Sequence, residues 1–536
     1  MEVKKLIPLL AATVFLTNLF GRDPYERQEA LDVLHYSFRL ELNDTTDRFA
    51  GEADIIIRFR KRTTSFFLDF GGRTKGEGMS VRAIWMKARQ LNYKHEGERL
   101  TVMMDEQIPA GETRSFTVWY SGTPEDGLLI SQNKFGDRTF FADHWPDRGH
   151  LWLPCIDHPS EKATVEFVII APDHYRVVAS GAKQEETALD KKRRLTRYME
   201  SVPVAMKVTA VGVARFSVKD EIVENVPQSI WVFPQNEREG FSDFAVATKI
   251  FTYFNQQVGP YAYEKLAHVQ SQTRWGGLEN AGNIFYNESS VTGQNKSEGL
   301  IAHEVAHQWF GDAVTENDWH HVWLSEGFAT GFATFYMEHA YGQLRMTEIL
   351  KDDRQKLVEY YRKNSNPVVD TTITDIGKVL NTNTSDKGGW VLQMLRIKVG
   401  DDAFWKGIRE FYNRYKNKNA MTADFRVAME TASGQNLGKF FDQWIYRGGH
   451  PKLDVSWTYQ GTKVPATVTI RQVQHEPAFT FPLDILFKLP NGKEVRETIL
   501  VDNREKTHQI KLPGKPLSLE VDPETRLLFE GKVNRK

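Results

Sequence analysis

Two histidines and a glutamate in His303-Glu304-Val305-Ala306-His307 have the residue types and spacing of a metal site. Residues four apart in an α-helix lie about 40° apart around the axis and about 6 Å along it, so both imidazoles can meet one metal ion. Glu304 lies beside them and is placed to act on water next to the metal rather than on the metal itself. The pattern predicts a helical site for metal-assisted hydrolysis, although so short a motif also arises by chance.

A third ligand strengthens this prediction. Zinc in a hydrolase takes three protein ligands and leaves one position open. Glu326, in Trp323-Leu324-Ser325-Glu326-Gly327-Phe328-Ala329, begins another helical pattern, and eighteen residues separate it from His307. Glycine and alanine at positions 327, 329, 331 and 333 should let this second helix approach the first closely. We therefore expect one Zn²⁺ per chain, held by His303, His307 and Glu326.

The segment between these helices holds further polar residues. Asp312 and Asp318 are candidates for orienting the two imidazoles, and ordinary solvated loop acids are an equally good interpretation. His320 and His321 are adjacent, so their side chains point in different directions, and we expect neither to contact the metal.

A glycine-rich segment precedes the metal motif, reading Trp275-Gly276-Gly277-Leu278-Glu279-Asn280-Ala281-Gly282-Asn283. Glycines in an extended segment leave room for another backbone, which suits an edge strand that pairs with a bound peptide. Glu279, just after such a strand, has the charge needed to capture a free α-ammonium group. The alternative is an ordinary glycine turn.

The elements that position these residues fall into three blocks, which predict a multidomain α+β chain. Alternation such as Tyr36, Phe38 and Leu40 indicates an N-terminal antiparallel β domain, residues 26–220. Helical spacing, as in Phe404, Ile408 and Phe411, indicates a mainly helical domain, residues 221–449. Short strands and turns return after two glycines and a proline, which predicts a small C-terminal β-sandwich, residues 450–536.

Composition limits the classes of function. The 536 residues include 69 basic and 70 acidic side chains, so no excess positive charge favours nucleic acid as a partner. Cys155 is the only cysteine, which excludes an internal disulfide and a cysteine-based zinc site. Neither the apolar content nor the charged content is that of a disordered or fibrous chain.

The first residues have the pattern of an export leader. Lys4 and Lys5 precede an apolar stretch from Leu6 to Phe20, which is short for a membrane span and fits a signal peptide. We therefore expect residues 1–25 to be a leader and the protein to be periplasmic or secreted. No small-x-small triplet follows the apolar stretch, so an uncleaved anchor that keeps the protein at a membrane is the alternative.

Taken together, these motifs resemble the gluzincin zinc aminopeptidases of peptidase family M1, the family of aminopeptidase N and leukotriene hydrolase. The metal motif continues as His307-Gln308-Trp309-Phe310-Gly311, and Gly-x-x-Glu-Asn has Leu278 where the family usually has Met. Further matching segments are Leu153-Pro154-Cys155-Ile156-Asp157-His158-Pro159 and Asp386-Lys387-Gly388-Gly389. The resemblance implies a saddle-like β domain, a thermolysin-like catalytic domain and a small β-sandwich, in a short, three-domain form.

The resemblance also implies residue roles. His303, His307 and Glu326 match the zinc ligands and Glu304 the general base. The substrate-binding positions are Glu279 for the amino group of the peptide, Gly276 and Gly277 for its backbone, and Asn280. The implied activity is removal of amino-terminal residues, one at a time, from peptides with a free amino terminus.

One position departs from the family pattern. Members usually carry a tyrosine two positions before the lysine of Lys-Gly-Ala, where its hydroxyl stabilises the oxyanion, and here Ser385 occupies that position. The family's Gln or Glu in the β domain has its nearest counterpart in Asp143. We expect a zinc aminopeptidase weakened by Ser385, and the rival hypothesis is a zinc-containing homologue that binds peptides with little or no turnover. No residue specifically favours an added epoxide hydrolase activity.

Overall fold

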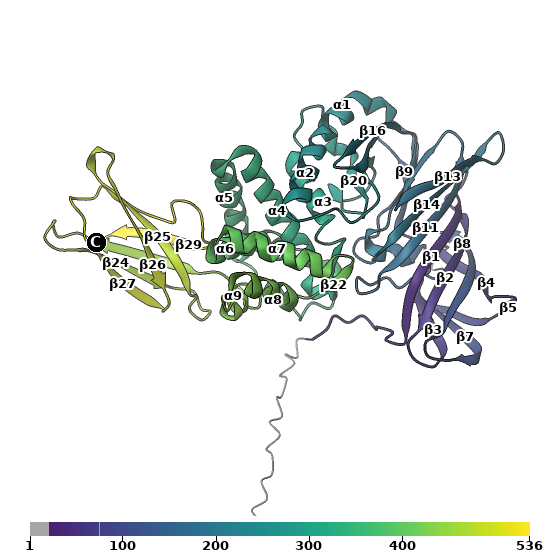
Figure 1. Cartoon of the computed structure of the whole chain (residues 1–536), viewed down its shortest axis with the longest axis horizontal. Helices are drawn as coiled ribbons and strands as arrows, with labels where there is room; N and C mark the ends of the chain where they lie inside the picture. The colour runs from purple at the N-terminus through teal and green to yellow at the C-terminus, as the bar shows by residue number, and fades with distance from the viewer. Residues whose placement is uncertain (1–20, 74–75) are drawn as a thin grey trace, which may run out of the picture.

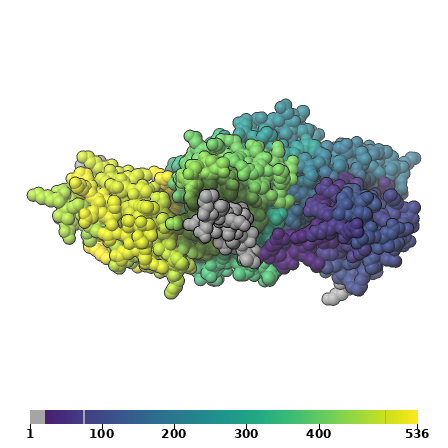
Figure 2. All heavy atoms as spheres, turned by 60° about the horizontal axis from the view of Figure 1, so that its bottom comes forward, coloured from purple at the N-terminus to yellow at the C-terminus, as the bar shows by residue number. Residues whose placement is uncertain are grey.

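The structure is a computed structural model that describes residues 21–73 and 76–536 (Figure 1). Three blocks follow one another along the longest axis, with the N-terminal strands at one end, the helices in the middle and the C-terminal strands at the other end. The space-filling view in Figure 2 has the same order, from purple and blue through green to yellow. The expected multidomain α+β class is confirmed. The apolar stretch Leu6–Phe20 of the predicted leader lies outside the described residues.

The N-terminal block is built on an eight-stranded sheet. The predicted alternation is present, because Tyr36, Phe38 and Leu40 all lie on the buried face of its strand β1. Strand β1 pairs in parallel with β11 and antiparallel with β2. In sheet order the strands are β13 (Ala182–Ala188), β14 (Arg193–Val204), β11 (Ala163–Pro172), β1 (Leu31–Glu41), β2 (Phe49–Phe59), β8 (Thr113–Thr123), β4 (Gly78–Met86) and β5 (Arg89–Gln90).

Two smaller sheets complete this block. One has the strand order β12 (Arg176–Ala179), β15 (Val211–Ala214), β10 (Arg138–Ala142) and β9 (Leu128–Gln132). The other has the order β3 (Thr63–Asp69), β7 (Arg99–Ile108) and β6 (Asn92–Glu96). The connection that leaves β10 reaches the middle block, and residues in it return in the description of the site.

The middle block begins with a mixed five-stranded sheet. Its order is β16 (Ser217–Val223), β17 (Val226–Val232), β18 (Leu266–Ser271), β20 (Asn283–Asn287) and β19 (Gly277–Leu278). The predicted border between residues 220 and 221 therefore falls inside β16, because the helical period begins only after the first hairpin of this sheet. Strand β19 lies within the glycine-rich segment and at the edge of the sheet.

Helices make up the rest of the middle block. The predicted face of α7 is buried at Phe404, Ile408 and Phe411. Among the described residues, no helix combines the length and apolar character needed to span a membrane. The helices are α1 (Glu237–Asp243), α2 (Ala247–Gln257), α3 (Glu298–His307), α4 (Trp323–Tyr341), α5 (Gln343–Tyr360), α6 (Gly388–Val399), α7 (Asp401–Tyr415), α8 (Thr422–Ser433) and α9 (Gly438–Trp444), with the short strands β21 (Val314–Glu316) and β22 (Lys418–Ala420) between them.

The C-terminal block consists of two sheets. Their facing side chains meet where the rings of Trp457 and Phe487 lie 5.4 Å apart in an edge-to-face contact. One sheet has the order β27 (Glu505–Ile510), β24 (Ala466–Gln472), β23 (Lys452–Thr458) and β29 (Glu530–Arg535). The other has the order β26 (Glu494–Val501), β25 (Phe481–Lys488) and β28 (Ser518–Val521).

The start of the described chain is fastened to the segment that leads into α4. The carboxylate of Asp23 is buried, accepts a hydrogen bond from the amide of Trp319 at 2.9 Å and pairs with Arg27 at 3.0 Å. Its Oδ2 also lies 3.0 Å from Nε2 of His158 in the β domain. Burial raises the pKa of Asp23, but these partners outweigh burial and hold the pKa well below its usual range. Asp23 thus joins the β domain to the middle block.

We expect Asp23→Ala to destabilise the protein by about 3 kcal/mol, because it leaves buried partners without their anion. Asp190→Ala is the matched control, since Asp190 forms an exposed pair with Arg193 that should contribute less than about 1 kcal/mol. Thermal unfolding followed by fluorescence measures both variants. Because the folded-state pKa of Asp23 is lowered, its contribution is complete above about pH 4 and is lost as the pH falls below that value. Equal melting temperatures for the two variants would contradict this account.

Candidate functional site

The metal motif lies at the end of α3, as predicted. His303 and His307 are one turn apart, and their Nε2 atoms are 3.1 Å from each other. Glu326 lies in the first turn of α4, with its Oε2 atom 3.6 Å from Nε2 of His303 and 3.9 Å from Nε2 of His307. Three ligands about 2.0–2.2 Å from a tetrahedral zinc ion are separated by about 3.3–3.6 Å. These donor atoms therefore fit one such ion.

The orientation of the His307 ring is fixed by contacts of its Nδ1 atom, on the opposite side of the ring from Nε2. Its Nδ1 lies 3.3 Å from the carbonyl oxygen of Phe310 and 3.1 Å from Oγ of Ser325. A proton on Nδ1 that is donated to Phe310 leaves the lone pair of Nε2 facing Glu326, which is the tautomer a metal ligand needs. Burial lowers the pKa of His307 to about 3, so the ring is neutral.

The acids and histidines between the helices have other partners. Oδ2 of Asp312 accepts a hydrogen bond from Gln308, and the carboxylate of Asp318 binds Arg27, His320 and the amide of Asp23. Among the described residues neither carboxylate is hydrogen-bonded to His303 or His307, and both are buried, so the structure matches neither the orienting role nor the solvated-loop interpretation. The predicted absence of His320 and His321 from the ligand set agrees with their partners, which are the carbonyl of Ile373 and the hydroxyl of Thr422.

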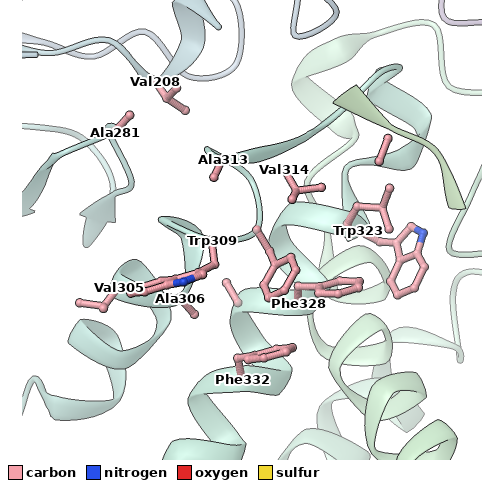
Figure 3. Packing of buried hydrophobic residues seen from close by; sticks show 14 of the residues in the cluster. Val208, Ala281, Val305, Ala306, Trp309, Ala313, Val314, Trp323, Phe328 and Phe332 are labelled. Atoms are coloured by element: carbon pink, nitrogen blue, oxygen red, sulfur yellow. The ribbon is translucent and has the colours of Figure 1, made fainter. Parts of the chain in front are cut away.

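The small residues of α4 explain how Glu326 is placed, but differently from the sequence prediction. A Cβ atom added at Gly327 would lie 2.8 Å from Cα of Gly388, and one added at Gly331 would lie 3.3 Å from Cα of Gly389. The glycines thus let α4 approach α6 rather than α3. Aromatic contacts with α4 come from the segment just after α3, where the ring of Phe310 lies 4.8 Å from that of Phe328 and 4.9 Å from that of Phe332. Figure 3 shows Trp309, Phe328 and Phe332 among the buried residues of this region.

Glu304 lies against the glycine-rich strand. A Cβ atom at Gly277 would fall 2.1 Å from Oε1 of Glu304, so only glycine leaves room for this carboxylate. Burial raises the pKa of Glu304, and the charges of Glu279 and Glu326 add to this rise against the opposing charge of His303. Crowded carboxylates of this kind are relieved by a bound cation, which is a second reason why a divalent metal fits the site.

Glu279 faces the same pocket from the loop after β19. Carboxylate oxygens of Glu279 and Glu304 and a ring nitrogen of His307 all lie within 4.8 Å of one another. The Glu279 side chain is buried, and its Oε1 has no hydrogen-bond partner among the described residues. A buried carboxylate oxygen without a partner is ready to accept a hydrogen bond from a bound cationic group.

Strand β19 offers a free edge next to these acids. Gly277 pairs with Tyr286 of β20, and the carbonyl of Gly276 accepts a hydrogen bond from the amide of Asn287 at 3.0 Å. The other edge of β19 has no neighbouring strand in the sheet of the described residues. An extended peptide can pair there, as the sequence suggested.

Gln308 ties this loop to the metal helix, a role that the sequence analysis did not assign. Its Nε2 donates to the carbonyl of Asn280 and to Asp312, and its Oε1 accepts from the amide of Gly282. The only sequence feature that pointed to Gln308 was its position directly after His307. Asn280, predicted to bind substrate, is buried and does not line the pocket.

Ser385 lies in a π-helical segment, η8 (Asn383–Lys387), that packs against α4. A Cβ atom added at Gly327, the residue after Glu326, would lie 2.9 Å from the carbonyl oxygen of Thr384 in this segment. The segment is therefore near the metal site. Ser385 itself does not line the pocket.

The pocket has a volume of about 380 Å³. The β domain contributes Trp145, and no sequence pattern singled out this residue or Leu300 and Leu380, which also line the pocket. Asp143 does not line it, because its carboxylate is buried against Arg148 and accepts a hydrogen bond from the amide of Arg274. The lining residues are Trp145, Trp275, Gly276, Gly277, Leu278, Glu279, Leu300, His303, Glu304, His307, Glu326 and Leu380.

Two protein-family models match the chain. The Peptidase M1 N-terminal domain matches residues 33–205, and the Peptidase family M1 domain matches residues 243–444. The second match contains both helices that carry the candidate metal ligands.

Curated relatives are aminopeptidases. Glutamyl aminopeptidase of Sus scrofa is 26% identical over 535 residues, which cover 92% of this chain and 56% of that protein. Glutamyl aminopeptidase of Homo sapiens is 27% identical over 458 residues, covering 79% of this chain and 47% of that protein. Aminopeptidase 2 of Candida albicans is 24% identical over 509 residues, which cover 90% of this chain and 54% of that protein. The chain thus spans about half the length of these relatives.

The purified protein should contain about one zinc ion per chain, and His307→Ala should lose it because only two ligands remain. His174→Ala is the control, since His174 lies on the surface of the β domain, and it should keep its zinc. Elemental analysis after gel filtration measures both. Full zinc content in His307→Ala would overturn the ligand set.

Proposed function

Because the chain belongs to peptidase family M1, we propose that it is a zinc-dependent aminopeptidase that removes the first residue of peptides with a free amino terminus. The observation that carries this proposal is the buried carboxylate of Glu279 beside the candidate metal ligands, whose Oε1 has no hydrogen-bond partner among the described residues. It offers a binding point for the terminal ammonium group about one residue away from the reacting carbonyl. An internal peptide bond brings no such charge.

His303, His307 and Glu326 would hold one Zn²⁺ ion. When bound in such a site, zinc supplies Lewis acidity, which both acidifies water and polarises a peptide carbonyl. The protein groups then determine which bond is presented. Backbone pairing along the free edge of β19, at Gly276 and Gly277, would hold the substrate extended, with its amino terminus at Glu279.

Glu304 would act as the general base. Its carboxylate accepts the proton that the attacking water loses and then delivers it to the amine that leaves when the C–N bond breaks. Because Gly277 has no side chain, the carboxylate of Glu304 has room inside the pocket. Asn280 and Gln308 hold the Glu279 loop through the hydrogen bond between Gln308 and the Asn280 carbonyl, so both are positioning residues in this proposal.

The second candidate is a zinc-containing homologue that binds peptide termini with little turnover. It is favoured by one observation, because Ser385 occupies the position of the family tyrosine and does not line the pocket. For the location of the protein we propose export through the predicted leader, with a free or membrane-held form depending on whether the leader is removed. Peptides are the proposed partners, and nucleic acid is not among them.

We expect Glu279→Gln to lower kcat/KM for peptides with a free amino terminus by at least about thirtyfold, with unchanged zinc content. Removing one side of a desolvated charge pair typically costs about 2 to 5 kcal/mol. Glu185→Gln, on the exposed strand β13, is the control and should leave hydrolysis unchanged. Hydrolysis by the wild type should stop when a chelator removes the metal.

N-acetylated peptides provide the decisive comparison, because acetylation removes the ammonium charge. The wild-type protein should cleave them far more slowly than the free peptides. Equal rates on free and acetylated peptides would contradict the proposed capture of the amino terminus by Glu279.

Ser385→Tyr should raise kcat at least about tenfold with little change in KM. A serine hydroxyl is several ångström closer to its backbone than a tyrosine hydroxyl, and one missing oxyanion donor typically lowers turnover by about 10²- to 10³-fold. The new contact would form mainly in the transition state, so kcat should respond rather than KM. Ser385→Phe is the matched control, because it adds the ring without the hydroxyl. No gain in the tyrosine variant, or an equal gain in both, would refute the assigned position.

A further inference from the structure

The residues that line the pocket are of two kinds. The polar residues have roles in the proposed reaction, and the apolar residues have none so far. Under the proposed function, Glu279 takes the ammonium group, Glu304 takes the proton, and His303, His307 and Glu326 take the metal. The side chain of the first substrate residue must therefore lie against the remaining walls. Apart from the backbone of Gly276 and Gly277, these walls are apolar and consist of Trp145, Trp275, Leu278, Leu300 and Leu380.

The two tryptophans form a braced aromatic corner. The rings of Trp145 and Trp275 meet edge to face at 6.4 Å, and Trp145 also meets Trp319 edge to face at 6.1 Å. Trp145 is 4% exposed and fixed, whereas Trp275 is 47% exposed and still has surface to cover. An apolar side chain placed here gains contact area without forcing a wall to move.

An acidic first residue finds no lysine or arginine to pair with in the same place. The lining residues that the structure describes include no lysine or arginine. Two arginines near these tryptophans in the sequence are already paired: Arg274, directly before Trp275, with Asp126 at 2.7 Å, and Arg148, three residues after Trp145, with Asp143. A substrate carboxylate would instead meet apolar walls and the carboxylates of the site itself, which is unfavourable both for its desolvation and for its charge.

We propose that the pocket selects peptides whose first residue is large and apolar, such as leucine, methionine or phenylalanine, and rejects those that begin with glutamate or aspartate. This preference rests on the proposed function and differs from the one in the printed name of the glutamyl aminopeptidase relatives. Trp145 and Trp275 are its specificity-determining residues.

A series of aminoacyl arylamides tests the preference through kcat/KM. Leucyl and phenylalanyl substrates should exceed the alanyl substrate at least about tenfold, since each methylene in an apolar pocket is worth roughly that much. They should exceed the glutamyl substrate at least about 100-fold, because its charge stays unpaired. A glutamyl substrate turned over as well as the leucyl one would overturn the proposal.

Tryptophan variants locate the preference. Trp275→Ala should reduce the ratio of leucyl to alanyl turnover about fivefold or more, with zinc content unchanged. Trp119→Ala is the control, because Trp119 is similarly exposed, at 45%, but lies on β8 of the β domain. Trp145→Phe keeps most of the ring packing and serves as the second variant at the buried position. An unchanged ratio in both Trp275→Ala and Trp145→Phe would show that other walls select the side chain.

Calorimetry separates failure of this inference from failure of the proposed function. The zinc-loaded protein is titrated with leucine amide and with the α-amide of glutamic acid, which share a free amino group and differ in their side chain. Absence of turnover with every arylamide would refute the aminopeptidase proposal, while tighter binding of leucine amide would still support the pocket preference. Equal binding of both amides, or binding of neither, would refute the preference.

Discussion

The site depends on holding five titratable side chains within a few ångström of one another. Two imidazoles and three carboxylates share this space, and burial together with mutual repulsion raises the pKa of both Glu279 and Glu304. A bound divalent cation removes much of that repulsion. The surrounding packing must still hold the groups together, and it does so through the glycine-on-glycine contact between α4 and α6 and through the rings of Phe310, Phe328 and Phe332 between α4 and the segment after α3.

The β domain contributes a positive charge near these acidic groups. Lys207 is fully buried, with Nζ 2.5 Å from Oε1 of Glu316 on β21. Burial raises the pKa of Glu279, and the charge of Lys207 opposes this rise. The pKa of Glu326 lies below its usual value, because the two histidines and Lys207 together outweigh burial. A buried ion pair need not add stability compared with apolar residues of the same size. Its consequence here is that the β domain and the helical block meet in one relative position, with a fixed positive charge beside the site.

The sequence was a good guide wherever the relevant neighbours are close along the chain. The spacing of His303 and His307 on one helix, and the alternation in β1, follow from local periodicity alone.

Contacts between distant segments could not be predicted in the same way. Trp145 enters the pocket from the β domain, and no local pattern distinguishes it from an ordinary core tryptophan. Gly327 correctly indicated a close helix contact, but a small residue does not specify which partner approaches, and the partner is α6. The orienting role predicted for Asp312 is not seen for a related reason, because the sequence does not show that its carboxylate accepts its hydrogen bond from Gln308.

At Ser385 the backbone segment and the side chain have to be considered separately. The π-helical turn Asn383–Lys387 is a type of segment that is common at functional sites, and it is held from behind by the hydroxyl of Tyr361, which donates to Asn383 and accepts from Lys387. That hydroxyl is fully engaged and Tyr361 does not line the pocket, so it does not replace the family tyrosine. Under the proposed function, the backbone of this segment beside α4 would carry the oxyanion donor, and the short side chain of Ser385 would weaken the reaction step. The metal ligands and the proposed binding point for the amino terminus come from other elements, so the residue at position 385 would leave both unchanged.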